Sequence, residues 1–512
     1  MPRYEFTEGS SSKFWQIDLK GSSFTTTYGK IGTSGQTSLK EYGDAAAAKK
    51  EHAKLIAEKT KKGYVLAGKA PVGKAIAKPA KAVPLKAAKP AVAAKTAGTP
   101  LEKQIDADPD NGDAWTVYAD WLQSQGDPRG ELAVVQERLA TDPKNAAMLS
   151  AEKKLLKDHR DSMIGGFAKY MCRSGKRDIA GITRKPDLGP DDREGDEDAA
   201  PIRVGWRAGF ITSAFVGYPG MEWSPAGSGG GDDDDDQDDE GGNSVDFSKL
   251  LLEVLASPAT RFLTSLHLGM PTHVDHGEAD YTQVIKKLVT SETLGRLRKL
   301  YLGDIDDEET MISSIFLGDL SKLWPKLSKL RSLTLRASGM KLGAIALPEL
   351  RELTIISGGL DNKVLASICA AKLPKLEKLE LWFGRERYGG NCKVKDLRPI
   401  LDGTTFKALK HLGLRNGEFA DELAAALPGA KILKQLTALD LSKGTMTEVG
   451  VKAMADHKDV FSHLRKLDLS DNYLGTSEKL ASTLMTAVRT KPQRKAHISG
   501  DGTIYRYAAI GE

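Results

Sequence analysis

The pattern L-x-x-L-x-[LI] recurs through the second half of the chain and constrains the fold more than any other feature. Successive copies begin 20 to 34 residues apart. A strand that alternates leucine with other residues buries only one face, so a single copy cannot stabilise itself, whereas stacked copies share a continuous core. We therefore predict stacked strands over residues 251–490, each followed by a helical return such as residues 364–372 or 480–489. The copies begin at Leu263, Leu297, Leu330, Leu350, Leu376, Leu409, Leu436 and Leu464.

This repeat resembles the repeat of leucine-rich repeat proteins. The resemblance implies an α/β solenoid whose strands line a concave face. One departure concerns the position that this family usually fills with asparagine, whose amide bonds to backbone groups at the turn. Asparagine occupies it only at Asn472, and the other copies have Pro, Ile, Ser or Gly there. We therefore expect irregular curvature.

Side chains of a strand alternate between two faces, so the third and fifth positions of each copy, and the position after the last leucine, face the concave surface. Both signs of charge occur at these positions, which argues against a phosphate-binding stripe. Aromatic and arginine side chains are typical anchors of protein interfaces. The alternative is that the apolar residues there are scattered exposed side chains. We predict a protein-binding surface with the candidate anchors Tyr301, Arg336, Ile356, Trp382 and Arg415.

Charge is divided unevenly along the 512 residues. The chain holds 74 Lys and Arg against 69 Asp and Glu. Residues 1–67 contribute +4, and residues 68–99 contribute seven Lys and no acid. The first 99 residues thus carry +11, which leaves −6 for the rest of a chain whose total is +5. Residues 68–99 are rich in Ala, Lys and Pro, which predicts a disordered cationic linker. Acids concentrate in two stretches, at 187–198 and 232–240. The expected partner of the linker is a polyanion such as nucleic acid, or the chain's own acidic loop at 232–240.

Residues 1–67 have the pattern of a small α+β domain. Residues 14–19 and 23–30 have strand-like compositions, and Asp44 would cap a helix that ends before Gly63. This region resembles the WGR domain, a module of poly(ADP-ribose) polymerases and of many bacterial proteins. The Trp-Gly-Arg that names the family is here Tyr28-Gly29-Lys30.

The WGR resemblance implies a set of nucleic-acid contacts. In the polymerases the Trp and Arg of the motif contact DNA ends, so Tyr28 would stack on a base and Lys30 would contact phosphate. Both replacements weaken the contact, because Lys lacks the guanidinium fork and Tyr is a smaller platform. Gln36, Lys13 and Lys40 are the further candidate contacts of this domain. Alternatively, Tyr28 is a core residue of its strand and Lys30 a solvated charge.

Residues 100–250 combine helical patterns with the two acidic stretches. Trp115, Tyr118 and Leu122 recur with the spacing of one helix face, so we expect them in a core. The segments 118–122 and 126–132 resemble the repeat-companion domain found beside repeats in proteins of planctomycetes and myxobacteria. The resemblance implies an architectural role and a bacterial source. We expect Asp120 and Arg129 to form a structural pair.

Motifs for catalysis or cofactor binding are sparse. The Gly-rich residues 227–231 lack the flanking strand and helix of a phosphate loop. His273 and His276, with acids beside them, are the strongest candidate metal ligands, and they define an alternative reading as a metal protein or cryptic enzyme. The three cysteines are far apart, which suits a reducing cytoplasm. No run approaches the roughly 18 apolar residues of a membrane span.

We therefore expect an α/β multidomain chain that is bacterial, cytoplasmic and non-enzymatic, with no cofactor, no metal and no membrane contact. Its parts would be residues 1–67, 68–99, 100–250, 251–490 and a C-terminal cap or tail at 491–512. The expected function is an adaptor that contacts DNA, or another polyanion, through its first 99 residues and a protein through its repeats. The alternative is a protein-interaction scaffold without a nucleic-acid role.

Overall fold

The computed structural model describes residues 3–8, 11–30, 36–41, 44–61, 65–66, 99–171, 182–183, 200–218, 246–272, 278–306 and 309–510. The chain forms two compact units, Met1–Ala94 and Lys95–Glu512, and each is described by itself. The Lys-rich linker, the two acidic stretches, and the candidate metal ligands His273 and His276 lie outside the described residues, as does Cys172, one of the three cysteines. No helix among the described residues is both long and apolar enough to cross a membrane.

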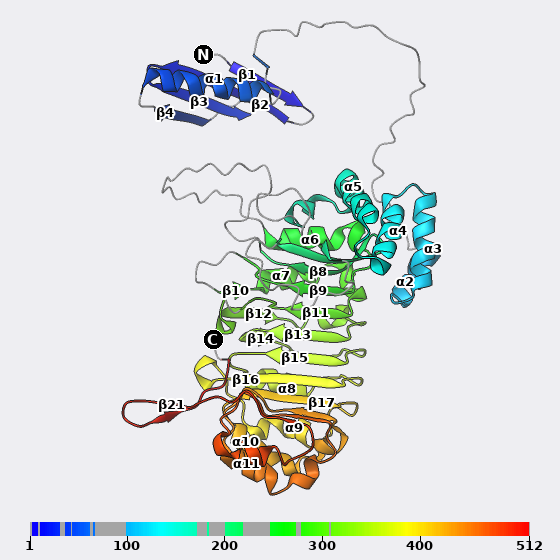
Figure 1. Cartoon of the computed structure of the whole chain (residues 1–512), viewed down its shortest axis with the longest axis vertical. Helices are drawn as coiled ribbons and strands as arrows, with labels where there is room; N and C mark the ends of the chain where they lie inside the picture. Colours follow the sequence, from blue (N-terminus) through cyan, green and yellow to red (C-terminus); the bar gives the residue numbers. More distant parts are fainter. Residues whose placement is uncertain are drawn as a thin grey trace. The chain divides into compact units, whose positions relative to one another are not determined.

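The first unit is an antiparallel five-stranded sheet with one helix against it (Figure 1). Its strands have the order β4-β3-β2-β1-β5. The elements are β1 (Arg3–Glu8), β2 (Ser11–Lys20), β3 (Ser23–Lys30), β4 (Gln36–Glu41), α1 (Ala45–Lys61) and β5 (Val65–Leu66).

A small core joins the helix of this unit to its sheet. Trp15, Ile17 and Phe24 are almost fully buried, and Leu55 and Ile56 of α1 pack against them. Trp15 and Ile17 reach the same core because alternate residues of a strand share a face. The helix begins directly after Asp44, at the position that the sequence predicts.

Four helices open the second unit, and each has a side-chain cap at its N-terminus. Thr99 and Glu102 form a capping box, in which each side chain accepts the backbone N–H of the other residue. A side-chain oxygen of Asn111, Asp127 or Asn145 caps each of the next three helices. The helices are α2 (Pro100–Ala107), α3 (Gly112–Ser124), α4 (Pro128–Thr141) and α5 (Ala146–Met163).

A β-hairpin of the main sheet docks against these helices. Strands β7 (Ile202–Arg207) and β8 (Phe210–Val216) meet at a turn in which Ala208 and Gly209 have φ values of 50° and 78°. The N–H of Gly209 donates to Oε1 of Gln136 at 3.1 Å. A Cβ at Gly209 would lie 2.7 Å from the carbonyl oxygen of Arg129, so this close approach requires glycine.

The apolar residues predicted to share one helix face do lie in a core. Trp115, Tyr118 and Leu122 are buried around Phe210 of the hairpin, as their helical spacing predicts. The expected pair of Asp120 and Arg129 is wrong, because Asp120 is exposed and Arg129 forms its ion pair with Asp127. The reason is local: Asp127 caps α4 and accepts from both the backbone and the guanidinium of Arg129.

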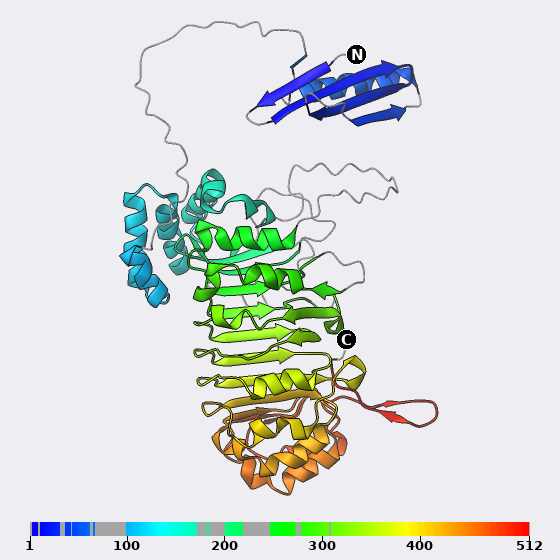
Figure 2. The ribbon, with the colours of Figure 1, turned by 180° about the vertical axis from the view of Figure 1, so that it is seen from behind.

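Twelve of the described strands form the main sheet, in the order β20-β19-β18-β17-β16-β15-β13-β11-β9-β8-β7-β6 (Figures 1 and 2). All neighbours from β8 to β20 are parallel, whereas β7 and β8 are antiparallel. The other strands are β6 (Ile182–Thr183), β9 (Ser265–Leu268), β11 (Lys299–Leu302), β13 (Ser332–Arg336), β15 (Glu352–Ile356), β16 (Lys378–Gly384), β17 (His411–Gly417), β18 (Ala438–Asp440), β19 (Lys466–Asp468) and β20 (Val488–Arg489).

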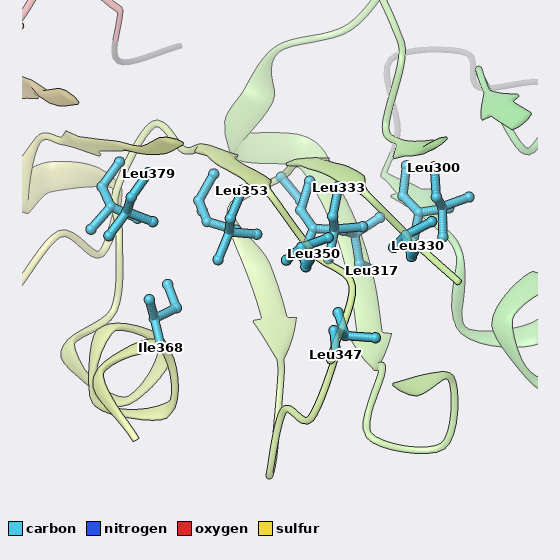
Figure 3. Packing of buried hydrophobic residues seen from close by; sticks show 14 of the residues in the cluster. Leu300, Leu317, Leu330, Leu333, Leu347, Leu350, Leu353, Ile368 and Leu379 are labelled. Carbon is cyan, nitrogen blue, oxygen red and sulfur yellow. The ribbon is translucent and has the colours of Figure 1, made fainter. Parts of the chain in front are cut away.

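The register of the sheet aligns the leucines of successive copies. Each of the strands β9 to β19 in this sheet begins at the third position of a predicted copy. Leu300 pairs with Leu333, Leu333 with Leu353, and Leu353 with Leu379. Figure 3 shows these leucines in a row, with Ile368 of a helical return packed beneath them. We call the opposite side of the sheet, which carries the third and fifth positions of the copies, the polar face.

The returns between the strands differ in part from the prediction of helices throughout. The returns that follow β11 and β13 contain the short strands β12 (Ile315–Asp319) and β14 (Gly339–Lys341). These two strands form a separate parallel sheet with β10 (Ala279–Asp280). Ile315 and Leu317 alternate with period two, which favours a strand. The copy at Leu330 leaves only 20 residues before Leu350, too few for a strand, two turns and a helix of several turns. The prediction of a helix over residues 480–489 is also wrong. The helix observed there, α12 (Glu478–Ala481), ends at Ala481, and residues 488–489 form strand β20.

The remaining elements are the helical returns, the second sheet and a C-terminal hairpin. Their bounds are α6 (Phe247–Ala256), β10 (Ala279–Asp280), α7 (Thr282–Leu288), β12 (Ile315–Asp319), β14 (Gly339–Lys341), α8 (Asn362–Cys369), α9 (Arg398–Leu401), α10 (Ala420–Ala426), α11 (Glu448–Ala455), α12 (Glu478–Ala481), β21 (His497–Ile498) and β22 (Ile504–Tyr505).

Candidate interaction surfaces

The five candidate nucleic-acid contacts all lie on the sheet of the first unit. The backbone register pairs Tyr28 with Trp15 on one side and with Gln36 on the other. Lys30 pairs with Lys13 across β2 and β3, and Lys40 lies on β4. The fold thus brings these residues onto three adjacent strands. Their side chains lie outside the described part of the structure, so their contacts stay predictions.

The candidate protein-binding residues lie along the polar face of the main sheet. Its centre is organised around Trp382 and Arg415, which pair across β16 and β17. The guanidinium carbon of Arg415 lies 4.5 Å from the centroid of the Trp382 ring. The ammonium of Lys443 lies 5.8 Å from the same ring centroid. Two cations therefore sit beside one aromatic ring, an arrangement stabilised by the quadrupole of the ring.

Glu380 joins this cluster together. Its carboxylate accepts hydrogen bonds from Nη1 of Arg415 and, at 2.8 Å, from Nε1 of Trp382. Burial alone would raise the pKa of Glu380, but the Arg415 charge and these hydrogen bonds hold the pKa below its ordinary value. Arg415 also donates to Oγ of Ser442 at 3.0 Å, and its Nε lies 3.4 Å from Oδ2 of Asp440. The side chains are thus already ordered without a partner.

Two candidate anchors are less exposed than the sequence predicts. Trp382 is 9% exposed and Arg336 is 6% exposed, whereas Tyr301, Ile356 and Arg415 are half-buried. The expectation that all five are exposed therefore fails for Trp382 and Arg336. For Trp382 the physical reason is that the Arg415 and Lys443 side chains lie over its ring and shield the ring from solvent.

The first strands of the polar face contain a buried ionisable pair. Nδ1 of His267 lies 2.8 Å from Oδ2 of Asp304, and both residues are almost fully buried. The His267 ring centroid lies 5.6 Å from that of Tyr301. This contact places the candidate anchor Tyr301 beside the ring of a buried histidine.

The candidate anchors chosen from the sequence do not include Glu380, Lys443, His267 or Asp304, although Glu380 and His267 occupy positions that the repeat pattern assigns to the concave face. The repeat pattern already places Glu380 and Trp382, two residues apart on one strand, on the same face, but it does not show that their side chains are hydrogen-bonded. No comparable signal marks Asp304, because its contact depends on the pairing of β9 with β11.

The described thiols are poor nucleophiles. Burial, together with Asp396, raises the pKa of Cys369 to about 11 and that of Cys392 to about 12. Within the described ranges, no group of three or more His, Cys, Asp or Glu side chains is placed to hold a metal ion. The candidate ligands His273 and His276 lie outside those ranges.

Comparison with known proteins identifies one domain of the chain. Residues 2–71 match the WGR domain. Two curated proteins of Escherichia coli K12 are similar to this part of the chain: protein YehF, 45% identical over 65 residues, and the uncharacterized protein YfeS, 44% identical over 62 residues. These matches cover 13% and 12% of this chain and 24% and 25% of the relatives, so the chain spans about a quarter of their length.

A solved structure is similar over nearly the whole length. This structural-genomics target from Bacteroides fragilis is 22% identical, with a TM-score of 0.46, and the match covers 96% of this chain and 97% of that one. The match to the WGR domain confirms the resemblance drawn from Tyr28-Gly29-Lys30 and its surroundings. The N-terminal unit of this α/β multidomain chain is therefore a WGR domain.

Proposed function

We propose that the chain is a non-enzymatic cytoplasmic adaptor. It contacts nucleic acid, DNA in particular, through its WGR domain and Lys-rich linker, and it binds a protein partner through the polar face of the main sheet. The observation that carries this proposal is the WGR match over residues 2–71, because this domain is associated with nucleic-acid binding. The free thiols of Cys369 and Cys392 are consistent with a reducing compartment.

Positive charge supports the nucleic-acid contact. The backbone brings Lys30 beside Lys13 and Tyr28 beside Gln36, which groups two cations and an aromatic residue on one small sheet. The seven Lys of residues 68–99 add positive charge without an acid. Such charge neutralises phosphates without reading sequence, so the proposed binding is weak, salt-sensitive and sequence-independent.

The stacked copies support the proposal of a partner-binding face. We propose that residues 251–490 are leucine-rich repeats that form a solenoid and that residues 100–250 are a repeat-companion region. Support comes from the in-register leucines and from the docking of the helices onto the β7–β8 hairpin. In such an architecture the strand positions opposite the leucines form an extended binding surface.

The DNA contact predicts a large effect of Tyr28→Ala combined with Lys30→Ala. We expect the full wild-type chain to shift a short DNA duplex at low salt and the double variant to bind at least about tenfold more weakly, since stacking and a phosphate contact are each worth about 1 kcal/mol or more. Fluorescence anisotropy at two salt concentrations measures both affinities.

Lys49→Ala is the matched control, because it removes one exposed positive charge from α1 of the same domain. It should weaken binding less than about threefold. Equal losses in the two variants would show that only net charge matters. Absence of wild-type binding at low salt would leave the protein-interaction scaffold as the function.

The partner-binding face predicts a selective effect of Ile356→Asp. Ile356 is half-buried at the end of β15 on the polar face, so a carboxylate there should repel an apolar partner. Affinity purification from the source cells, with the full chain as bait, should lose the partner in this variant. Val449→Asp on α11, where the side chain is 64% exposed, is the control and should retain it. Retention by both variants would exclude the polar face as the interface.

A further inference from the structure

The C-terminal segment folds back across the carboxyl ends of the last strands of the main sheet. Residues 507–510, which we call the strap, follow the β21–β22 hairpin that projects from the body (Figures 1 and 2). Four of the residues that hold the strap follow or end successive strands, and we call these four the row; a fifth, Arg494 in the segment before the hairpin, donates from Nη1 to the carbonyl of Tyr507. The row consists of Arg385 after β16, Asn416 at the end of β17, Lys443 after β18 and Tyr473 after β19.

Asn416 and Lys443 bind main-chain atoms of the strap. The Nδ2 of Asn416 donates to the carbonyl of Ile510, and its Oδ1 accepts the N–H of the same residue at 2.9 Å. The carbonyl oxygen of Lys443 accepts the N–H of Ala509 at 2.8 Å. One asparagine amide thus satisfies both backbone groups of a strap residue, as a neighbouring strand would.

Tyr473 and Arg385 bind the first half of the strap. The Tyr473 hydroxyl donates to the carbonyl of Tyr507 at 3.0 Å and accepts its N–H at 3.1 Å. Nη2 of Arg385 donates to the carbonyl of Ala508 at 3.1 Å, and the guanidinium carbon lies 4.9 Å from the Tyr507 ring centroid. Each of the four strap residues therefore forms at least one main-chain hydrogen bond with a residue of the row.

Burial along the strap indicates which sequences the row accepts. Ala508 is fully buried, so this position admits only a small side chain. Tyr507 is 38% exposed, and Ala509 and Ile510 are half-buried, so these positions are less restricted. The strap does not use every donor of the row, because Nε of Arg385 is buried without a hydrogen-bond partner among the described residues.

We propose that the row is a binding site for an extended peptide segment of another protein, with a small residue at the position of Ala508, and that the strap is its occupant within the chain. Hydrogen bonds to the main chain give affinity for any extended segment, and the pocket for Ala508 gives selectivity. This inference does not rest on the nucleic-acid contact or on the polar face, so it can fail or hold independently of the proposed function.

The hairpin before the strap has exposed apolar side chains that a partner could bind in order to displace the strap. The chain before the hairpin is fixed, because the carbonyl of Pro492 accepts from Asp471 N–H and Arg494 N–H donates to Asn472. Between this anchor and the strap, Ile498 and Ile504 are 65% and 54% exposed. A partner that covers these side chains and supplies its own extended segment would replace the strap.

The test uses the full chain and a fluorescent peptide with the sequence of residues 505–512, YRYAAIGE. In the wild-type chain the tethered strap competes at an effective concentration of about millimolar order, so we expect little binding of added peptide. Ala508→Trp displaces the strap, because the buried position has no room for an indole. We expect fluorescence anisotropy to show at least about tenfold tighter peptide binding to this variant.

Asn416 supplies the control for main-chain recognition. Adding Asn416→Gly to the Ala508→Trp chain should abolish binding, because glycine tolerates the φ of 56° at this position but lacks the amide. A peptide N-methylated at the position of Ile510 should also fail. The matched control is Asn391→Gly in the same Ala508→Trp chain. Asn391 is a loop asparagine outside the row, so this change should leave the affinity for the peptide unchanged.

A chain that ends at Arg506 provides a second empty row without a bulky substitution, and it should bind the peptide as Ala508→Trp does. The proposal is overturned if neither chain binds the peptide. It is also overturned if binding survives Asn416→Gly and N-methylation, since the contact would then not depend on the main chain.

Discussion

Replacing Gly384 with alanine should destabilise the second unit by about 2–5 kcal/mol. Gly384 ends β16 with a φ of 68°, a conformation that costs an L-residue about 1–2 kcal/mol. A Cβ there would lie 1.8 Å from the carbonyl oxygen and 2.0 Å from the carbonyl carbon of Gly358. Both are backbone atoms, so the clash is relieved only by shifting one strand end against the next. Chemical denaturation, compared at equal m value, measures the loss.

Gly475→Ala separates the steric contribution from the conformational one. Gly475 also has a positive φ, of 53°, but a Cβ there would meet no atom within 4 Å. We therefore expect this variant to lose only about 1–2 kcal/mol. Similar losses in the two variants would show that the close approach to Gly358 contributes nothing.

Gly384 also shows how far the sequence determines the fold. In the sequence it stands at the position at which leucine-rich repeats, which the copies resemble, usually have asparagine, so the sequence alone shows it only as a departure from that pattern. The structure supplies the reason for glycine, which is the contact with Gly358 of the preceding copy. That contact depends on the register of β15 and β16 and on the turns that follow them, which no local pattern specifies.

The leucines were predictable because their burial follows from periodicity alone. Strands start where the L-x-x-L-x-[LI] pattern places them, and Leu353 or Leu379 is buried as expected. The returns were less predictable, because packing between neighbouring copies decides between a strand and a helix. Around Ile315 the alternation of apolar residues favours the strand that forms there, whereas the repeat pattern predicts a helix.

The candidate sites show the same division. The location of Tyr28 and Lys30 on a strand follows from composition. The chemistry around Trp382 does not, because Glu380, Arg415 and Lys443 come from three copies that meet only in the folded sheet. The contacts between the row and the strap are even less predictable from local patterns, because Asn416 and Ile510 are separated by 94 positions in the sequence.

Asn472 is the single asparagine at the repeat position, and Asn472→Ala should cost about 2–4 kcal/mol of unfolding free energy. The side chain is fully buried. Its Nδ2 donates to the carbonyls of Leu441, Leu469 and Ser470, at 2.9, 3.1 and 3.3 Å, and its Oδ1 accepts the N–H of Met446 at 3.0 Å. Alanine leaves these buried backbone groups without partners, and each such group costs about 1–3 kcal/mol before the structure relaxes.

Asn391→Ala is the matched control for this prediction. Asn391 is exposed, and its Oδ1 accepts one backbone hydrogen bond, from Asn362 at 2.6 Å. Water replaces that bond in the variant, so the expected loss is below about 1 kcal/mol. The difference between the two variants isolates the effect of burial, because the same amide is removed in both. A loss at Asn472 no larger than the loss at Asn391 would mean that the last copies relax around the missing amide, and that the amide does not fix the turn between β18 and β19.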